Sequence, residues 1–150
     1  AGCSSFSNQG LLVLGHSGAG KSTLVRCLGA EQLGDEVIRV GLSEHGAWLQ
    51  GTPVPGELKA DHLRPLGLEA MIVPGHFKGG TVLERLSPVE ATHILLSAAI
   101  RLSGQEMGAD LNWAKRILEI VPMYRLSWDP SHILDVEALL SRIFPCSPGS

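Results

Sequence analysis

The sequence predicts an α/β protein with a mixed sheet, and three observations support this prediction. An apolar run at Leu11–Leu14 leads into a glycine-rich loop and then into Lys21–Leu28, whose apolar residues have helical spacing. Short apolar or β-branched runs, separated by turn-forming residues, recur along the chain. Two longer stretches, beginning at Pro88 and Ser131, have helical patterns. We therefore expect the loop at the carboxyl end of a central strand, where ligands bind in such sheets.

The individual elements follow from local patterns. The polar residues 1–10 are interpreted as an edge strand that ends in a turn, and Gly29 as the stop of the first helix. Further strands are predicted at Glu36–Val40, Ala47–Gln50, Leu68–Val73, Thr81–Leu86 and Met123–Trp128. Helices are predicted at Pro88–Leu102, Asp110–Ile120 and Ser131–Ile143. The first of these three is apolar nearly all round, so it should be substantially buried, and Asp129 or Ser131 should cap the last.

Three connecting stretches have the composition of loops. Gly51–Pro65, reading GTPVPGELKADHLRP, is predicted to be an irregular loop, and long loops of this kind are often functional. Residues 74–80, PGHFKGG, are interpreted as a turn between two strands, and the last residues, PCSPGS, as a frayed tail.

Composition is typical of a small enzyme domain. A length of 150 residues, 44% of them hydrophobic, predicts one domain, 1–150, with a real core. The net charge of −3 gives no electrostatic reason to expect nucleic acid or an anionic membrane. With no bilayer-length apolar run and no leader pattern, a cytoplasmic location is expected. Cys3, Cys27 and Cys146 suggest neither a disulfide framework nor a zinc site, and Cys27 is interpreted as a small buried hydrophobe.

The residues GHSGAGKS, 15–22, match the phosphate-binding pattern G-x-x-x-x-G-K-S. Gly15, Gly18 and Gly20 would let several backbone N–H groups point at one anion, and the following helix would add its positive end. Lys21 would reach the β- and γ-phosphates, and the Ser22 hydroxyl would bind Mg²⁺. The predicted nucleotide-binding residues are Gly15, His16, Ser17, Gly18, Ala19, Gly20, Lys21, Ser22 and Thr23.

The carboxylates that would complete such a site are Asp35 and Glu36. Common phosphate-loop nucleotidases have four apolar residues ending in Asp on a later strand, and this pattern is not found here. Asp35 and Glu36 instead follow the loop helix, at the expected mouth of the next strand. A strand beginning there can place a carboxylate beside the β- and γ-phosphates.

Several segments together resemble the catalytic domain of HPr kinase/phosphorylase and the HPr kinase-related proteins, whose core is similar to phosphoenolpyruvate carboxykinase. They are GHSGAGKSTLVRCL followed by LGDEVIRV, GTPVPGE at 51–57, LERLSPVEATHILL at 83–96 and VPMYRLSWDPSHILDVEALL at 121–140. The last three are more similar to the related subgroup than to HPr kinase itself. The resemblance covers most of the chain and implies a phosphoenolpyruvate-carboxykinase-like fold.

The resemblance also implies roles for individual residues. Lys21 and Ser22 would hold ATP and Mg²⁺, Asp35 would take the proton from an acceptor serine, and Glu36 would lie near the metal. The family's histidine at the end of the strand before the loop would fall just before Ala1. The Leu-Glu-Ile-Arg-Gly signature and the basic C-terminal helix of HPr kinases are not found, which favours an acceptor other than HPr, such as a serine in a ribosomally made peptide.

The remaining polar and aromatic residues give weaker signals. Glu57 is either a further site carboxylate or an exposed loop residue. Lys78 and Arg125 would contact acceptor or phosphate, or simply be solvated. The histidines have no metal-ligand spacing: His16 would point to solvent or the nucleotide, His93 would be a core or boundary residue, and His45, His62 and His76 would lie in loops. Trp48, Trp113 and Trp128 are interpreted as core anchors.

The activity that these features predict is ATP-dependent, Mg²⁺-dependent phosphorylation of a serine hydroxyl on a protein or peptide. Two alternatives stay open. One is a catalytically weak nucleotide-binding module that regulates a partner. The other is a small-molecule kinase or carboxykinase-like enzyme. Neither a nucleic-acid nor a membrane partner is expected, and an oligomer is compatible with the resemblance.

Overall fold

The structure is a computed structural model that describes residues 2–6, 9–15, 20–27, 31–34, 38–51, 65–98 and 107–143. Its strands are β1 (Gly2–Phe6), β2 (Gln9–Val13), β3 (Glu31–Gly34), β4 (Ile38–Ser43), β5 (Gly46–Gly51), β6 (Leu66–His76), β7 (Thr81–Arg85) and β8 (Met123–Trp128). Its helices are α1 (Lys21–Cys27), α2 (Pro88–Ala98), α3 (Met107–Ile120) and α4 (Ile133–Ile143), the last preceded by the 3₁₀ turn Pro130–His132.

The strands form a mixed sheet, as expected for the predicted α/β class. Across the sheet the order is β3-β1-β2-β6-β8-β7, and the β4–β5 hairpin joins at the first residues of β6. The strands β2, β6 and β8 are parallel to one another, whereas β1 and β7 pair antiparallel with their neighbours. The strand before the glycine-rich loop, β2, therefore lies inside the sheet, with a partner on each side.

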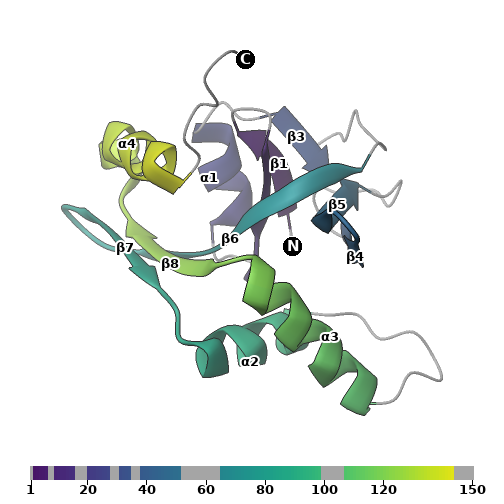
Figure 1. Ribbon diagram of the computed structural model, residues 1–150. Helices are drawn as coiled ribbons and strands as arrows, with labels where there is room; N and C mark the ends of the chain where they lie inside the picture. The colour runs from purple at the N-terminus through teal and green to yellow at the C-terminus, as the bar shows by residue number, and fades with distance from the viewer. Residues whose placement is uncertain are drawn as a thin grey trace.

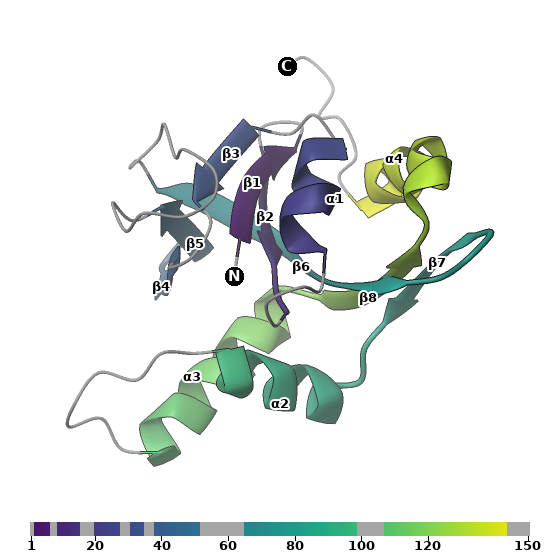
Figure 2. The ribbon, with the colours of Figure 1, turned by 180° about the vertical axis from the view of Figure 1, so that it is seen from behind.

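Helices cover both faces of the sheet, because side chains alternate between the faces along each strand. Leu11 and Val13 pack with buried residues of α1 and α4, whereas Leu12 and Leu14 pack with those of α2 and α3. Figures 1 and 2 show α1 and α4 on one side of β6 and β8, with α2 and α3 on the other. The result is a three-layer α/β/α arrangement.

The N-terminal strand is not at the sheet edge, so that prediction is wrong. β1 pairs with β2 on one side and with β3 on the other. No strand was expected at Glu31–Gly34, because its sequence, EQLG, has little β-propensity. The strand predicted at Glu36–Val40 is found as β4, which runs from Ile38 to Ser43.

β6 continues three residues beyond its predicted end, through residues that were assigned to a turn. Pro74, Gly75 and His76 pair in parallel with Leu126, Ser127 and Trp128 of β8. β2 no longer pairs with β6 after Ile72, so this part of β6 has a partner on one side only. Proline is tolerated there because its missing N–H faces no second strand. The turn itself occupies residues 77–80.

The expected burial of α2 is wrong. Ser87 caps the helix, since its Oγ accepts a hydrogen bond from Glu90 N at 3.3 Å. Ala91 and Leu95 are buried against the sheet, but Val89 is 80% exposed and His93 is also exposed. Although α2 is apolar nearly all round, it is a surface helix that is buried on one side, because α3 and the sheet cover only part of its circumference.

Several other local predictions have clear outcomes. Asp129 caps the turn that leads into α4, accepting from Ser131 N at 3.0 Å. Trp128 is 3% exposed, and Trp48 lies across Gly41, its partner in the β4–β5 hairpin. Cys27 is exposed rather than buried, because Leu24 and Val25 form the inner face of α1. In the described part of the chain, no helix combines the length and apolar character needed to cross a membrane.

Candidate functional site

The parallel strands β2, β6 and β8 bring their carboxyl ends to the same edge of the sheet. Leu14, directly after β2, still donates a hydrogen bond from its N–H to Ile72 O of β6, at 2.8 Å. The backbone then leaves the sheet at Gly15, while β6 continues to His76 and β8 to Trp128. Ligands bind at this edge in open α/β sheets, so the position predicted for the glycine-rich loop is one where a ligand can be held.

The two ends of the glycine-rich loop are described, whereas its residues 16–19 lie outside the described part. Gly20 has φ 90°, in the left-handed region that favours glycine. Its carbonyl accepts from Leu24 N at 3.0 Å, which begins α1. Lys21 Nζ donates to Gly15 O at 2.8 Å, linking the last part of the loop to its first residue. The ammonium is thus directed back toward the start of the loop.

The other predicted loop residues are only partly described. Thr23 is exposed on the first turn of α1. The backbone of Ser22 is helical, but its side chain is not described, and His16, Ser17, Gly18 and Ala19 lie among the undescribed residues. The sequence-based assignments of Mg²⁺ binding to Ser22 and of phosphate binding to these four residues remain predictions.

The two candidate carboxylates also lie outside the described residues, but the strand before them does not. Asp35 and Glu36 directly follow Gly34, the last residue of β3. Gly34 is opposite Cys3 of β1, and Cys3 is opposite Leu12 of β2. Because neighbouring strands are about 4.8 Å apart, Gly34 lies about 10 Å from β2, close to the same carboxyl edge. The two carboxylates therefore directly follow the end of a strand, whereas they were expected at the start of one.

His76 also lies at this edge, although no motif in the sequence points to it. It ends β6, the parallel neighbour of β2, and its Cε1 lies 3.8 Å from the position that a Cβ on Gly20 would occupy. The side chain is exposed. The sequence placed it in a loop because Pro74 and Gly75 precede it. The rule that adjacent parallel strands end at one edge of a sheet could have placed the end of β6, and with it His76, beside the loop.

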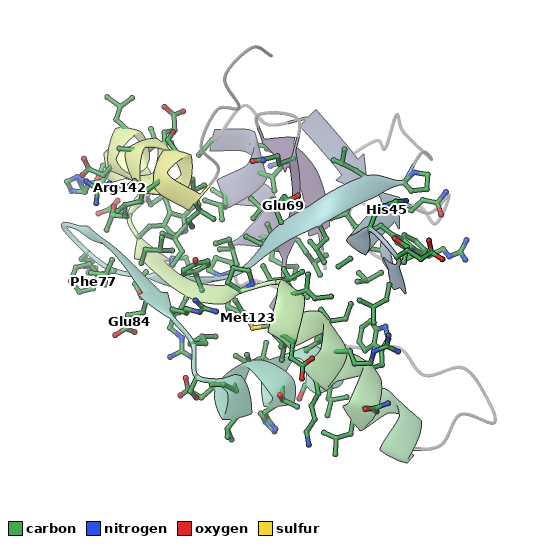
Figure 3. All side chains as sticks on the ribbon, in the orientation of Figure 1. His45, Glu69, Phe77, Glu84, Met123 and Arg142 are labelled. Carbon is green, nitrogen blue, oxygen red and sulfur yellow. The ribbon has the colours of Figure 1, made fainter. Side chains whose placement is uncertain are left out.

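The turn after β6 crosses the end of β8 and is held there by hydrogen bonds. Phe77 N donates to Trp128 O at 3.1 Å, and Gly79 N donates to the carboxylate of Asp129 at 3.2 Å. Lys78 is exposed on this turn. Arg125 is not brought to the edge, because it sits in the middle of β8, opposite Glu84. Figure 3 shows Phe77 at this turn and His45 on the opposite side of the molecule, at the β4–β5 hairpin.

We expect Asp129→Asn to reduce the loss of thermal stability that acidification causes. Hydrogen bonds from Ser131, the bond from Gly79 N–H and the nearby His132 lower the pKa of Asp129 below its ordinary value of 3.8, against an opposing effect of desolvation. A carboxyl whose pKa is lower in the folded state stabilises the protein above its unfolded pKa, and this stabilisation is lost as the pH falls through the folded pKa. Thermal unfolding at pH 7 and at about pH 3 measures the difference.

In that experiment Glu119→Gln is the control, because Glu119 is an exposed carboxylate on α3. The wild-type protein and the control should lose more thermal stability on acidification than Asp129→Asn does. An equal loss in all three proteins would contradict the role assigned to Asp129 in fixing the turn.

Among the described residues, no three His, Cys, Asp or Glu side chains cluster as a metal site. The remaining candidates from the sequence, Glu57 and His62, lie outside the described part, as does nearly all of the Gly51–Pro65 loop. The residues that the structure does bring together are Gly15, Gly20, Lys21 and His76. Comparisons of this chain with protein-family models, with curated proteins and with solved structures found no match.

Proposed function

We propose that the protein binds Mg²⁺ and ATP at residues Gly15–Thr23 and transfers the γ-phosphoryl group to a serine hydroxyl of a protein or peptide. The main support is the position of Lys21. Its Nζ bonds Gly15 O across a loop with the G-x-x-x-x-G-K-S pattern, at the carboxyl end of a strand inside a mixed sheet. A glycine-rich turn without a ligand would not require a lysine directed across it.

The residues at the site fit a bound magnesium nucleotide. The left-handed backbone conformation of Gly20 and the ammonium of Lys21 suit an anion. Ser22 directly follows Lys21, at the position of the pattern that supplies a hydroxyl to the metal. When bound, Mg²⁺ would neutralise charge on the phosphates. Lys21 would hold the terminal phosphates and stabilise the negative charge that develops on the transferred group.

Serine phosphorylation also needs a group that accepts the hydroxyl proton. In the proposed reaction the serine oxygen forms a bond to the γ-phosphorus, the bond from that phosphorus to ADP breaks, and the proton goes to the carboxylate of Asp35. Glu36 would lie near the metal. The position of β3 supports these roles, since this strand ends at Gly34, close to the edge of the sheet that carries the loop. The resemblance to HPr kinase-related proteins supports them as well.

We expect Asp35→Asn to lower the rate of transfer by about 100-fold or more, because a positioned base contributes that much to proton transfer. Affinity for Mg²⁺ and ATP should stay within about twofold, since the variant keeps the loop and Lys21. Transfer from labelled ATP to serine peptides gives the rate, and calorimetry gives the affinity.

The control for this prediction is Asp135→Asn, an exposed position on α4. If folded wild-type protein releases no heat with saturating Mg²⁺ and ATP, the proposed function is wrong. If it binds ATP but Asp35→Asn retains full transfer, the nucleotide site stands and the role of Asp35 is wrong. Binding without transfer to any peptide favours the regulatory module or the small-molecule enzyme.

A further inference from the structure

The end of β6 places one side chain beside the glycine-rich loop, and this side chain has no role in the reaction proposed above. β6 lies directly beside β2 and runs parallel to it, and the two are bonded up to Ile72. His76 is four residues further along and ends the strand. Because successive side chains alternate, His76 is on the same face as Ile72, which packs in the cluster formed with α1. The imidazole is therefore on the side of the sheet where the loop meets α1.

We propose that His76 is a phosphate-binding residue that contacts the γ-phosphate of the nucleotide, an inference that rests on the proposed function. Its Cε1 lies 3.8 Å from where a Cβ on Gly20 would be, which is ordinary van der Waals contact with that position. Gly20 immediately precedes Lys21, the residue that reaches the terminal phosphates in this pattern. A side chain against Gly20 thus lies beside the part of the loop that faces those phosphates.

The chemistry at the end of β6 suits a phosphate oxygen better than Mg²⁺. The strand ends in Pro74, Gly75 and His76 and so presents an imidazole there, not a carboxylate. A carboxylate at this place would be a ligand for Mg²⁺, whereas an imidazole N–H donates a hydrogen bond to phosphate oxygen. His76 is exposed, so its ring nitrogens are accessible to a ligand.

The backbone that carries His76 is well fixed. His76 pairs with Trp128, which is buried, and the next residue, Phe77, donates its N–H to Trp128 O at 3.1 Å. The carboxylate of Asp129 also holds the following turn through Gly79 N. The imidazole is thus attached to a paired strand end, so little ordering of the backbone is needed when it contacts a ligand.

The test compares the affinities of His76→Ala for Mg²⁺ with ATP and for Mg²⁺ with ADP, measured by calorimetry on the full chain. We expect the affinity for ATP to fall about tenfold, because a hydrogen bond to a charged group is lost, while that for ADP changes less than about twofold. His76→Gln keeps an N–H donor on a chain of similar reach, so its affinity for ATP should lie nearer to that of the wild-type protein.

The matched control is His93→Ala, because His93 is an exposed histidine on α2, on the other face of the sheet. Near-ultraviolet circular dichroism of each variant shows whether it is folded. If the wild-type protein binds ATP and His76→Ala binds ATP and ADP as the wild type does, the inference is overturned but the proposed function is not. Equal losses for ATP and ADP also overturn the γ-phosphate assignment. If the wild-type protein binds neither nucleotide, the proposed function itself is wrong.

Discussion

Replacing Lys21 by alanine is expected to lower the affinity for Mg²⁺ and ATP by about 100-fold. The ammonium is bonded to Gly15 O at 2.8 Å, so it lies at the loop to which the proposed function assigns the phosphates. Hydrogen bonds to charged groups contribute about 1.5–3 kcal/mol, which corresponds to roughly 10- to 150-fold in affinity. We expect a value near the upper end, because one cation would contact two phosphates. Calorimetric titration with Mg²⁺ and ATP measures the loss.

The control for Lys21→Ala is Lys115→Ala, since Lys115 is an exposed lysine on α3. It removes the same charge from the protein but not from the loop, so its affinity should be unchanged. Lys21→Ala also loses the bond to Gly15 O, which contributes about 1 kcal/mol to stability, and thermal unfolding shows whether the variant is folded at the temperature of the titration. A folded Lys21→Ala protein with wild-type affinity would contradict the nucleotide site.

The parts of the fold that the sequence predicts well are those encoded by neighbouring residues. Leu11–Leu14 gives four consecutive buried positions, and Gly20, Lys21 and Ser22 mark the start of a helix, so β2 and α1 follow from local pattern. β8 has the predicted bounds, Met123–Trp128, because Pro122 precedes it and its residues are mostly apolar. Of the predicted binding residues, Gly20 lies directly before α1 and Lys21 is its first residue, as the motif predicts, while their role in binding stays a prediction.

The parts that the sequence does not predict depend on pairing between distant segments. β3 is a strand because β1 offers it an open edge, which nothing in EQLG indicates. The last residues of β6 are strand rather than turn because β8 pairs with them. That pairing is what places His76 beside Gly20. Similarly, the composition of α2 indicates burial on all sides. The elements that actually cover it, α3 and the sheet, lie on one side only, so Val89 stays exposed.

The largest effect on stability is expected for Gly10→Ala. Gly10 is buried in β2, where β2 passes β6 and β5. A Cβ there would overlap the carbonyl oxygen of Gly67 and lie 3.2 Å from its carbonyl carbon and 3.0 Å from Leu49 Cδ2. The carbonyl belongs to the backbone of β6, so it cannot turn away as a side chain would. We expect the free energy of unfolding to fall by about 3 kcal/mol, the upper part of the range for an overpacked core, measured by urea denaturation.

Gly67→Ala is the matched control, because it adds the same methyl group to the other member of this close pair. Among the described residues, a Cβ on Gly67 would meet only Glu69 Oε1, at 3.6 Å, which is ordinary contact, and Gly67 lies in the extended strand β6. An alanine that fits its backbone conformation reduces the freedom of the unfolded chain, so the control should be unchanged or up to about 1 kcal/mol more stable.

The opposite signs of the two effects distinguish a real clash at Gly10 from a general sensitivity of the sheet to alanine. Equal destabilisation by both variants would mean that β2 and β6 do not approach as closely at Gly10 as the structure has them. In that case the placement of His76 beside the loop, which depends on the same pair of strands, would also be in question.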